Sequence, residues 1–216
     1  MAISAAEIKQ LRERTNAPMM DCKKALTETD GDMDKAVEFL RKKGLASAKK
    51  RAGRVAAEGA VGSYIHGEGR IGVMVEVNCE TDFVARTEGF QSLVHEIAMQ
   101  IAASSPLYVR PEEVPQAEID KEKEIRTAQL KDQGKPDKII PKILEGQIKK
   151  WYTDICLMEQ TYNRDRDKTI TDLVNDLSAQ TGEKISVRRF ARYELGEGLE
   201  KRSNDLGAEV AEMINS

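Results

Sequence analysis

The sequence predicts an α+β protein, in which an N-terminal helical unit precedes a core domain with a small antiparallel sheet and flanking helices. Apolar residues in the first 44 positions recur at helical spacing, whereas residues 71–78 alternate between apolar and other side chains. Helical periodicity returns in several later segments. A length of 216 residues suits one large domain or two modest ones.

Composition excludes several classes of protein. No stretch approaches the roughly 20 apolar residues that a membrane-spanning helix requires. The net charge of -3 argues against a general polyanion binder, so a nucleic-acid contact would need a local basic patch. The three cysteines, Cys22, Cys79 and Cys156, fit neither a disulfide framework nor a zinc site. They favour a reduced compartment, and we expect a cytoplasmic protein.

Residues 1–44 are predicted to form a unit of three helices. Ser4 followed by Glu7 fits a capping box, in which side chains bind the first unpaired amide groups of a helix. Asp32 is a suitable cap for the third helix. Gly44 can adopt the left-handed conformation that often follows a helix, so we expect the third helix to end there.

Residues 45–58 are predicted to form a basic helical linker. The run 41–54 contains seven basic residues and no acidic one. A solvated linker helix is the favoured interpretation, and the alternative is a surface for an anionic partner such as RNA. The RNA alternative is the weaker one because no aromatic side chain is interleaved to stack on a base.

The core domain is predicted to cover residues 59–200. Residues 59–66 and 71–78 read as two strands, and glycines in the intervening turn make them a hairpin. A long helix follows, with apolar residues at helical spacing from Phe90 to Ile101.

Residues 107–168 are predicted to form a charged helical insertion. Two exposed helices are expected within it, near 116–132 and 137–155, joined by a loop that contains glycine and proline. The sequence gives no role for this insertion.

The end of the core is predicted to be a helix and a strand. The helix starts near Ile170 and stops at Gly182. The strand covers 184–194 and places Ile185, Val187 and Ala191 on one side. A last helix is expected in residues 201–216.

No catalytic arrangement is present in the sequence. The two Gly-Glu-Gly triplets, at 67–69 and 196–198, lack the third glycine or lysine of a phosphate-binding fingerprint. The histidines His66 and His95 are each isolated. We therefore expect no catalytic residue, no metal site and no cofactor.

Phe83 is unusual for its position. It lies beside Asp82, where the second strand turns into the long helix. Binding residues are often placed on such a turn between rigid elements. Alternatively, Phe83 lies seven residues before Phe90 and can continue the apolar stripe of the core. Spacing alone leaves both interpretations open.

Met20 is the second unusual residue. The core face of its helix is defined by Met19, Cys22, Ala25 and Leu26. At about 100° per residue, Met20 falls on roughly the opposite side from Cys22. An exposed methionine near basic residues suits an adaptable partner surface.

Three ordered stretches carry a family resemblance. The first comprises Leu11–Thr15 and Met19–Leu26, and the second is Glu76–Ala85. The third is Ile185–Phe190, followed by the Gly-Glu-Gly triplet at 196–198. Together they resemble the signatures of the translation elongation factor Ts family of bacteria and organelles. The resemblance spreads over residues 1–200.

The resemblance implies a guanine-nucleotide exchange factor for the GTPase elongation factor Tu, and not an enzyme. It implies that residues 81–84 dislodge magnesium from the GTPase; these residues are Thr81, Asp82, Phe83 and Val84. Phe83 would wedge near the switch region, and Asp82 would hydrogen-bond beside it. Arg12, Met19 and Met20 would contact a helix of the GTPase, from a unit similar to ubiquitin-associated domains.

The chain departs from the long members of that family, which carry two core subdomains and a coiled coil. Here only one core subdomain is expected, so a homodimer is a further expectation, with no membrane contact and no direct nucleic-acid contact. The competing hypotheses are a ribosome- or RNA-binding module that uses residues 41–54, and a scaffold that binds through residues 1–44 alone.

Overall fold

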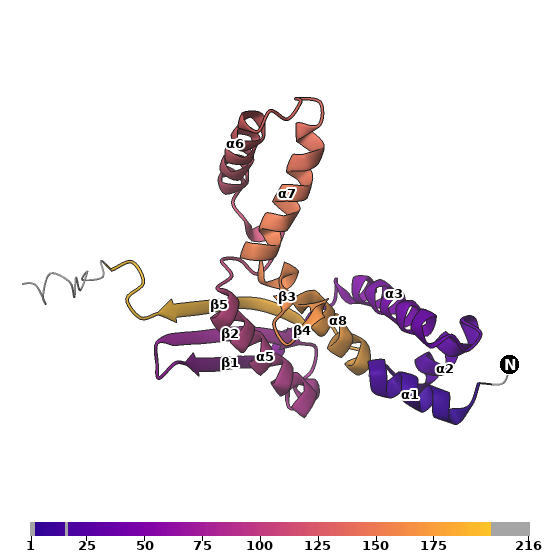
Figure 1. Ribbon diagram of the computed structural model, residues 1–216. Helices are drawn as coiled ribbons and strands as arrows, with labels where there is room; N and C mark the ends of the chain where they lie inside the picture. The colour runs from indigo at the N-terminus through magenta and orange to yellow at the C-terminus, as the bar shows by residue number, and fades with distance from the viewer. Residues whose placement is uncertain (1–2, 16, 200–216) are drawn as a thin grey trace, which may run out of the picture.

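The computed structural model describes residues 3–15 and 17–199, and it has the predicted α+β architecture (Figure 1). The α-helices are α1 (Ala5–Thr15), α2 (Met19–Glu28), α3 (Met33–Arg51), α4 (Asp82–Ala85), α5 (Glu88–Ser104), α6 (Gln116–Asp132), α7 (Ile140–Ile155) and α8 (Ile170–Thr181). The strands are β1 (Glu58–His66), β2 (Ile71–Cys79), β3 (Thr161–Tyr162), β4 (Asp165–Thr169) and β5 (Ser186–Glu194). The predicted helix at 201–216 lies outside the described residues.

Helices α1–α3 form the predicted N-terminal unit around a small core of its own. The capping box is confirmed: Glu7 N donates to Ser4 Oγ at 3.2 Å, and Ser4 N donates to Glu7 Oε2 at 2.8 Å. Asp32 caps α3, because its Oδ1 accepts hydrogen bonds from two backbone amides of the first turn. The buried residues of this core are Leu11, Cys22, Ala25, Leu26 and Ala36.

The predicted end of the third helix at Gly44 is wrong, because α3 continues to Arg51. A glycine inside a helix costs only about 1 kcal/mol relative to alanine. The residues that follow include Ala46, Ala48 and Lys50, all good helix formers, and they outweigh that cost. The first half of the predicted linker is therefore a direct extension of α3.

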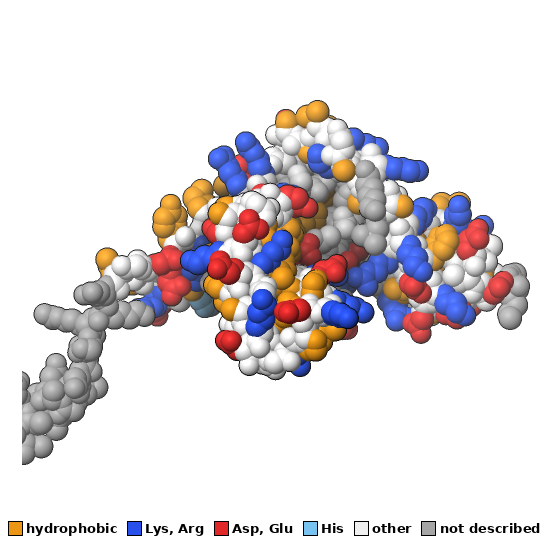
Figure 2. All heavy atoms as spheres, turned by 90° about the horizontal axis from the view of Figure 1, so that it is seen from above, with side chains coloured by type: hydrophobic (Ala, Val, Ile, Leu, Met, Phe, Trp, Pro, Cys, Tyr) orange, Lys and Arg blue, Asp and Glu red, His pale blue; other side chains and the backbone are white. Residues whose placement is uncertain are grey.

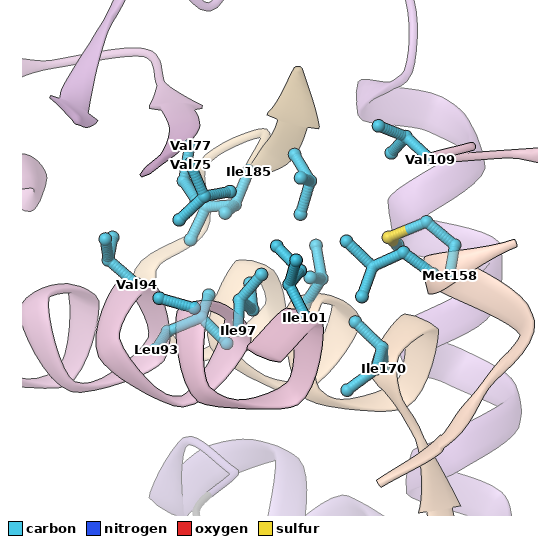
Figure 3. Close-up of a cluster of buried hydrophobic side chains, with 14 of the residues drawn as sticks. Val75, Val77, Leu93, Val94, Ile97, Ile101, Val109, Met158, Ile170 and Ile185 are labelled. Carbon is cyan, nitrogen blue, oxygen red and sulfur yellow. The ribbon is translucent and has the colours of Figure 1, made fainter. Parts of the chain in front are cut away.

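The main sheet has the strand order β1-β2-β5, with both pairs antiparallel. Val73, Val75 and Val77 of β2 lie on its inner face and are buried. Helices α5 and α8 pack on this side, and the apolar side chains of α5 point towards the strand residues (Figure 3). The alternation predicted for residues 71–77 is confirmed, and it places the main core on one face of the sheet.

The prediction that Ala191 shares a side with Val187 is wrong, because β5 contains a bulge. Val77 pairs with Val187, but Glu76 pairs with Arg189, so Arg188 is an extra residue. One extra residue reverses the alternation beyond it. Phe190 therefore packs against the core, and Ala191 is exposed.

Two ion pairs form at the bulge. It brings Arg188 and Arg189 to the same carboxylate: Arg188 Nη1 lies 2.8 Å from Glu76 Oε1, and Arg189 Nε lies 2.7 Å from Oε2. These hydrogen bonds lower the pKa of Glu76 to about 2. The two arginines thus hold the strand pair together at the point where the register shifts.

The two helices predicted in the insertion are confirmed as α6 and α7, which form a hairpin that protrudes from the core (Figure 1). Its base is tied down where Leu107 N donates to Ile155 O at 2.8 Å. The short β3–β4 hairpin after it was not predicted, because its sequence is polar and charged. Within the described residues, no helix is both long and apolar enough to cross a membrane.

Candidate partner-binding site

Residues 80–85, here called the 80–85 loop, follow the end of β2, include the short helix α4 and lead towards α5. Thr81 caps the four-residue helix α4: its Oγ1 accepts a hydrogen bond from Val84 N at 3.4 Å. Thr87 caps α5 in the same way, through Phe90 N at 3.3 Å. Each helix thus has its own threonine cap, so α4 ends at Ala85 and α5 begins separately at Glu88.

A set of hydrogen bonds, here called the Glu183 bridge, fixes the start of this loop to the segment before β5. Glu183 Oε2 accepts from the amides of Glu80 at 3.0 Å and Thr81 at 3.1 Å. Its Oε1 accepts from Thr81 Oγ1 at 2.6 Å. Each of these interactions joins residues about a hundred positions apart, so the bridge exists only in the folded chain.

The side chain of Glu80 forms a hydrogen bond in the opposite direction, from the 80–85 loop to the segment before β5. Its Oε1 accepts from the amide of Lys184 at 2.6 Å, and this hydrogen bond is the largest cause that lowers the pKa of Glu80. The same carboxylate pairs with Arg54 at 3.2 Å. Lys184 Nζ in turn donates to Arg54 O at 2.9 Å. The linker after α3 is therefore joined to the base of the 80–85 loop.

The side chains of the loop divide into two groups. Val84 packs against the main core, and Thr81 is occupied by the cap and the bridge. Phe83 is 81% exposed, although Phe90 is completely buried. The alternative that Phe83 continues the core stripe is therefore wrong. Asp82 lies beside Phe83, and its Oδ2 pairs with Arg86 Nη2 at 2.9 Å.

The N-terminal candidates lie on a different surface. Met20 is 71% exposed, which confirms its predicted position opposite the buried Cys22. Met19 is 48% exposed, so its assignment to the core face of α2 is wrong. Met19 is the first residue of the helix and extends past the packed turns. Arg12 is exposed near the end of α1.

The 80–85 loop and the N-terminal candidates Arg12, Met19 and Met20 belong to two different structural units. Helices α1–α3 and the sheet have separate hydrophobic cores. The two units meet where α3 lies against α8, and Arg41 Nη2 of α3 lies 3.1 Å from Asp172 Oδ1. A partner that contacts both Met20 and Phe83 would have to span both units.

Four of the seven basic side chains in the run 41–54 are paired with neighbouring acids. The ion pairs are Arg41 with Asp172, Lys42 with Glu38, Lys43 with Asp21 and Arg54 with Glu80. On the face seen from above, basic and acidic side chains are intermixed over the helical unit and the hairpin (Figure 2). These observations favour a packed linker over an RNA-binding patch.

The three cysteines are free and buried. Burial raises the thiol pKa values of Cys22 and Cys79, and it raises that of Cys156 to about 12. A protonated thiol is a poor nucleophile and a poor metal ligand. Across residues 3–15 and 17–199, no group of three or more His, Cys, Asp or Glu side chains could hold a metal ion.

Sequence reasoning missed the residues that hold the loop. Glu80, Glu183, Lys184 and Arg54 carry the bridge and its extension, yet none was singled out. The available signal was weak: Glu183 and Lys184 follow the helix-ending Gly182 and precede a strand, a position in which many polar residues occur.

Comparisons with known proteins agree on one family. A family model described as "Elongation factor TS" matches residues 9–197. Elongation factor Ts of Desulforamulus reducens is 61% identical over 214 residues, which cover 99% of each chain. Elongation factor Ts of Geobacter sulfurreducens is 61% identical over 211 residues, or 98% of each chain. The corresponding protein of Desulfitobacterium hafniense is 57% identical over 213 residues.

Proposed function

Because the chain belongs to the elongation factor Ts family, we propose that it is a guanine-nucleotide exchange factor for elongation factor Tu. In this proposal it binds the GDP complex of the GTPase, dislodges magnesium and promotes GDP release, so that GTP can bind. It acts in the cytoplasm, where translation elongation takes place.

The observation that carries the proposal is the exposure of Phe83 on a rigid support. An exposed aromatic side chain is costly to leave in water and is typical of the anchor residues of protein interfaces. The Glu183 bridge and the Thr81 cap fix the backbone on which Phe83 stands. A side chain held in this way can insert into a partner without the loss of conformational entropy that ordering a flexible loop would require.

The mechanism needs no covalent step. If the factor binds the nucleotide-free GTPase more tightly than the GDP complex, then GDP and the factor weaken each other's binding by the same free energy. Insertion of Phe83 beside the nucleotide site, with Asp82 hydrogen-bonding next to it, supplies contacts that exist only when the GTPase has rearranged. In this proposal exchange is therefore coupled binding.

The direct test is stopped-flow release of a fluorescent GDP analogue from elongation factor Tu. We expect this protein to raise the release rate in a saturable manner. A release rate that is unchanged at micromolar concentrations of the protein would refute the proposed function.

Substitution of Met20 by aspartate tests the N-terminal surface. We expect weaker association with the GTPase, by roughly tenfold, because the charge would have to be buried at an apolar contact. The melting temperature should barely change, since exposed substitutions usually alter stability by less than about 0.5 kcal/mol. Titration calorimetry measures the affinity, and Met20→Leu is the matched control that keeps an apolar side chain. An equal affinity for the two variants would exclude this surface.

We propose in addition that the protein is a homodimer, through the outer face of the sheet. Four large apolar side chains on this face are more than half exposed: Val61, Ile65, Met74 and Tyr193. They lie on the side opposite the buried valines of β2. A contiguous apolar patch on a sheet face is typical of an interface. A second copy presents the same apolar face, so the contact would be isologous.

Met74→Glu is expected to convert the dimer into a monomer. Met74 lies on the central strand, so a pair of dimer-related carboxylates would approach each other in the middle of the interface. Sedimentation equilibrium measures the mass, and Ile125→Glu on the protruding hairpin is the control. A wild-type protein that is monomeric at tens of micromolar would contradict the homodimer.

A further inference from the structure

A cavity of about 460 Å³ lies where the end of α3 meets α8 and the start of β5. Its volume is within the range of roughly 300–1,000 Å³ that small-molecule sites occupy. Its walls consist of small, polar and aliphatic residues around three cationic side chains. The residues are Ala48, Arg51, Ala52, Arg110, Asn175, Ser178, Lys184, Ile185, Ser186 and Val187.

The charged side chains that line this cavity are all positive among the described residues. Arg51, Arg110 and Lys184 contribute cations, and none of its described lining residues is acidic. The nearby carboxylates are already engaged: Glu80 pairs with Arg54 at 3.2 Å, and Glu113 pairs with Arg110 Nη1 at 3.4 Å. Two lining cations, Arg51 and Lys184, therefore have no carboxylate partner among the described residues, in a protein whose net charge is -3.

Arg51 is the lining residue whose side chain has unsatisfied hydrogen-bond donors. Its Nε and Nη2 atoms are buried and have no hydrogen-bond partner among the described residues. Buried guanidinium nitrogens without partners are costly, because they lose their hydrogen bonds to water. The other arginines of the basic run 41–54 form ion pairs, so Arg51 differs from Arg41 and Arg54.

The two remaining cations are held in place by hydrogen bonds to backbone carbonyl oxygens. Arg110 Nη2 donates to Val187 O at 2.7 Å, which fixes its guanidinium beside β5. Lys184 Nζ donates to Arg54 O at 2.9 Å, and an ammonium group has three protons to donate. Asn175, Ser178 and Ser186 add polar atoms to the wall. A ligand in the cavity would thus be surrounded by cationic and polar side chains from several segments of the chain.

We propose that this cavity binds an inorganic di- or oligophosphate through Arg51, Arg110 and Lys184. Arg110 already pairs with Glu113, so Arg51 and Lys184 are the lining cations that lack a carboxylate partner among the described residues. A pyrophosphate carries enough negative charge for both, and its oxygens have the geometry that guanidinium groups recognise. None of the described lining residues is aromatic, so none of them would stack on a nucleobase. The phosphate chain is therefore the recognised part of the ligand.

Such a ligand would join α3 to the core. Arg51 is the last residue of α3, while Arg110 and Lys184 belong to the core domain. Lys184 also adjoins the Glu183 bridge. The site does not include Phe83 or Met20, so binding can be measured on the free protein without the GTPase. The outcome is thus independent of the proposed exchange function.

The test is titration calorimetry of the free protein with pyrophosphate, at constant ionic strength. We expect one saturable site, and a loss of affinity of at least about tenfold in Arg51→Gln, which removes one charge-assisted contact. Lys50→Gln is the matched control, because it removes the same charge from an exposed neighbour. It should change the affinity less than about twofold, since exposed charges are screened. Lys184→Gln should resemble Arg51→Gln.

Thermal melting provides a second readout that does not depend on heats of binding. Pyrophosphate at ten times its Kd should raise the melting temperature of the wild type by about 3 °C, and that of Arg51→Gln by much less at the same concentration. Melting of the unliganded Arg51→Gln variant shows whether it is folded. If it is unstable, Arg51→Lys keeps the charge, and its affinity should lie between those of the other two proteins.

Three results would overturn the proposal. The first is the absence of saturable pyrophosphate binding up to millimolar concentration. The second is an equal loss of affinity in Lys50→Gln and Arg51→Gln, which would indicate non-specific attraction. The third is tighter binding of citrate than of pyrophosphate with the same dependence on Arg51, which would assign the cavity to carboxylates. Equal affinities for pyrophosphate and ADP would support the expectation that only phosphates are recognised.

Discussion

Replacement of Phe83 by alanine is expected to slow the catalysed release of GDP from elongation factor Tu by at least about tenfold, because truncation of a central aromatic anchor commonly costs 2 kcal/mol or more. The melting temperature should stay almost unchanged. Phe83 is 81% exposed, so its removal opens no cavity in the core. Stopped-flow release and thermal melting, measured on the same preparation, check both parts of this prediction.

Two controls make the Phe83 result specific. Leu107→Ala truncates another large exposed apolar side chain outside the 80–85 loop, and exchange should remain within about twofold of the wild type. Phe90→Ala truncates the buried phenylalanine and should cost about 3–5 kcal/mol of stability. If Phe83→Ala melts early like Phe90→Ala, Phe83 is a packing residue and the proposed anchor is wrong.

Most elements of the fold could be predicted because their apolar residues follow one period without interruption. Residues 71–77 alternate and form β2. The helices near 116–132 and 137–155 follow instead from the loop with glycine and proline that separates them, because α6 buries only Leu130. The errors arose where a single residue interrupts the pattern. Gly44 was read as a stop signal within a sequence that favours helix, and the extra residue Arg188 reversed the alternation before Ala191.

The exposure of Phe83 could not be decided from spacing. The separation of seven positions from Phe83 to Phe90 implies a common face only if one helix contains both. The chain instead ends α4 at Ala85 and begins α5 at Glu88, so the period does not extend across the junction. The Glu183 bridge was equally inaccessible to sequence reasoning. Its partners lie about a hundred residues apart and meet only because β2 pairs with β5.

Glu183→Ala is expected to cause a large loss of stability for a surface-proximal substitution. The carboxylate of Glu183 accepts hydrogen bonds from the amides of Glu80 and Thr81 and from Thr81 Oγ1. Its removal leaves these partly buried donors without an acceptor, which we expect to cost about 2–4 kcal/mol in total. In a chain of 216 residues that corresponds to a fall of about 5–10 °C in melting temperature.

The same variant should also impair exchange at temperatures where it remains folded. The 80–85 loop would lose its attachment to the segment before β5, so Phe83 would have to be ordered at the moment of binding, at a cost in affinity. Glu183→Gln keeps one accepting oxygen and should be intermediate in both measurements. Glu124→Ala, an exposed glutamate of α6, is the control and should change neither. A Glu183→Ala variant with wild-type melting and wild-type GDP release would show that the bridge does not position Phe83.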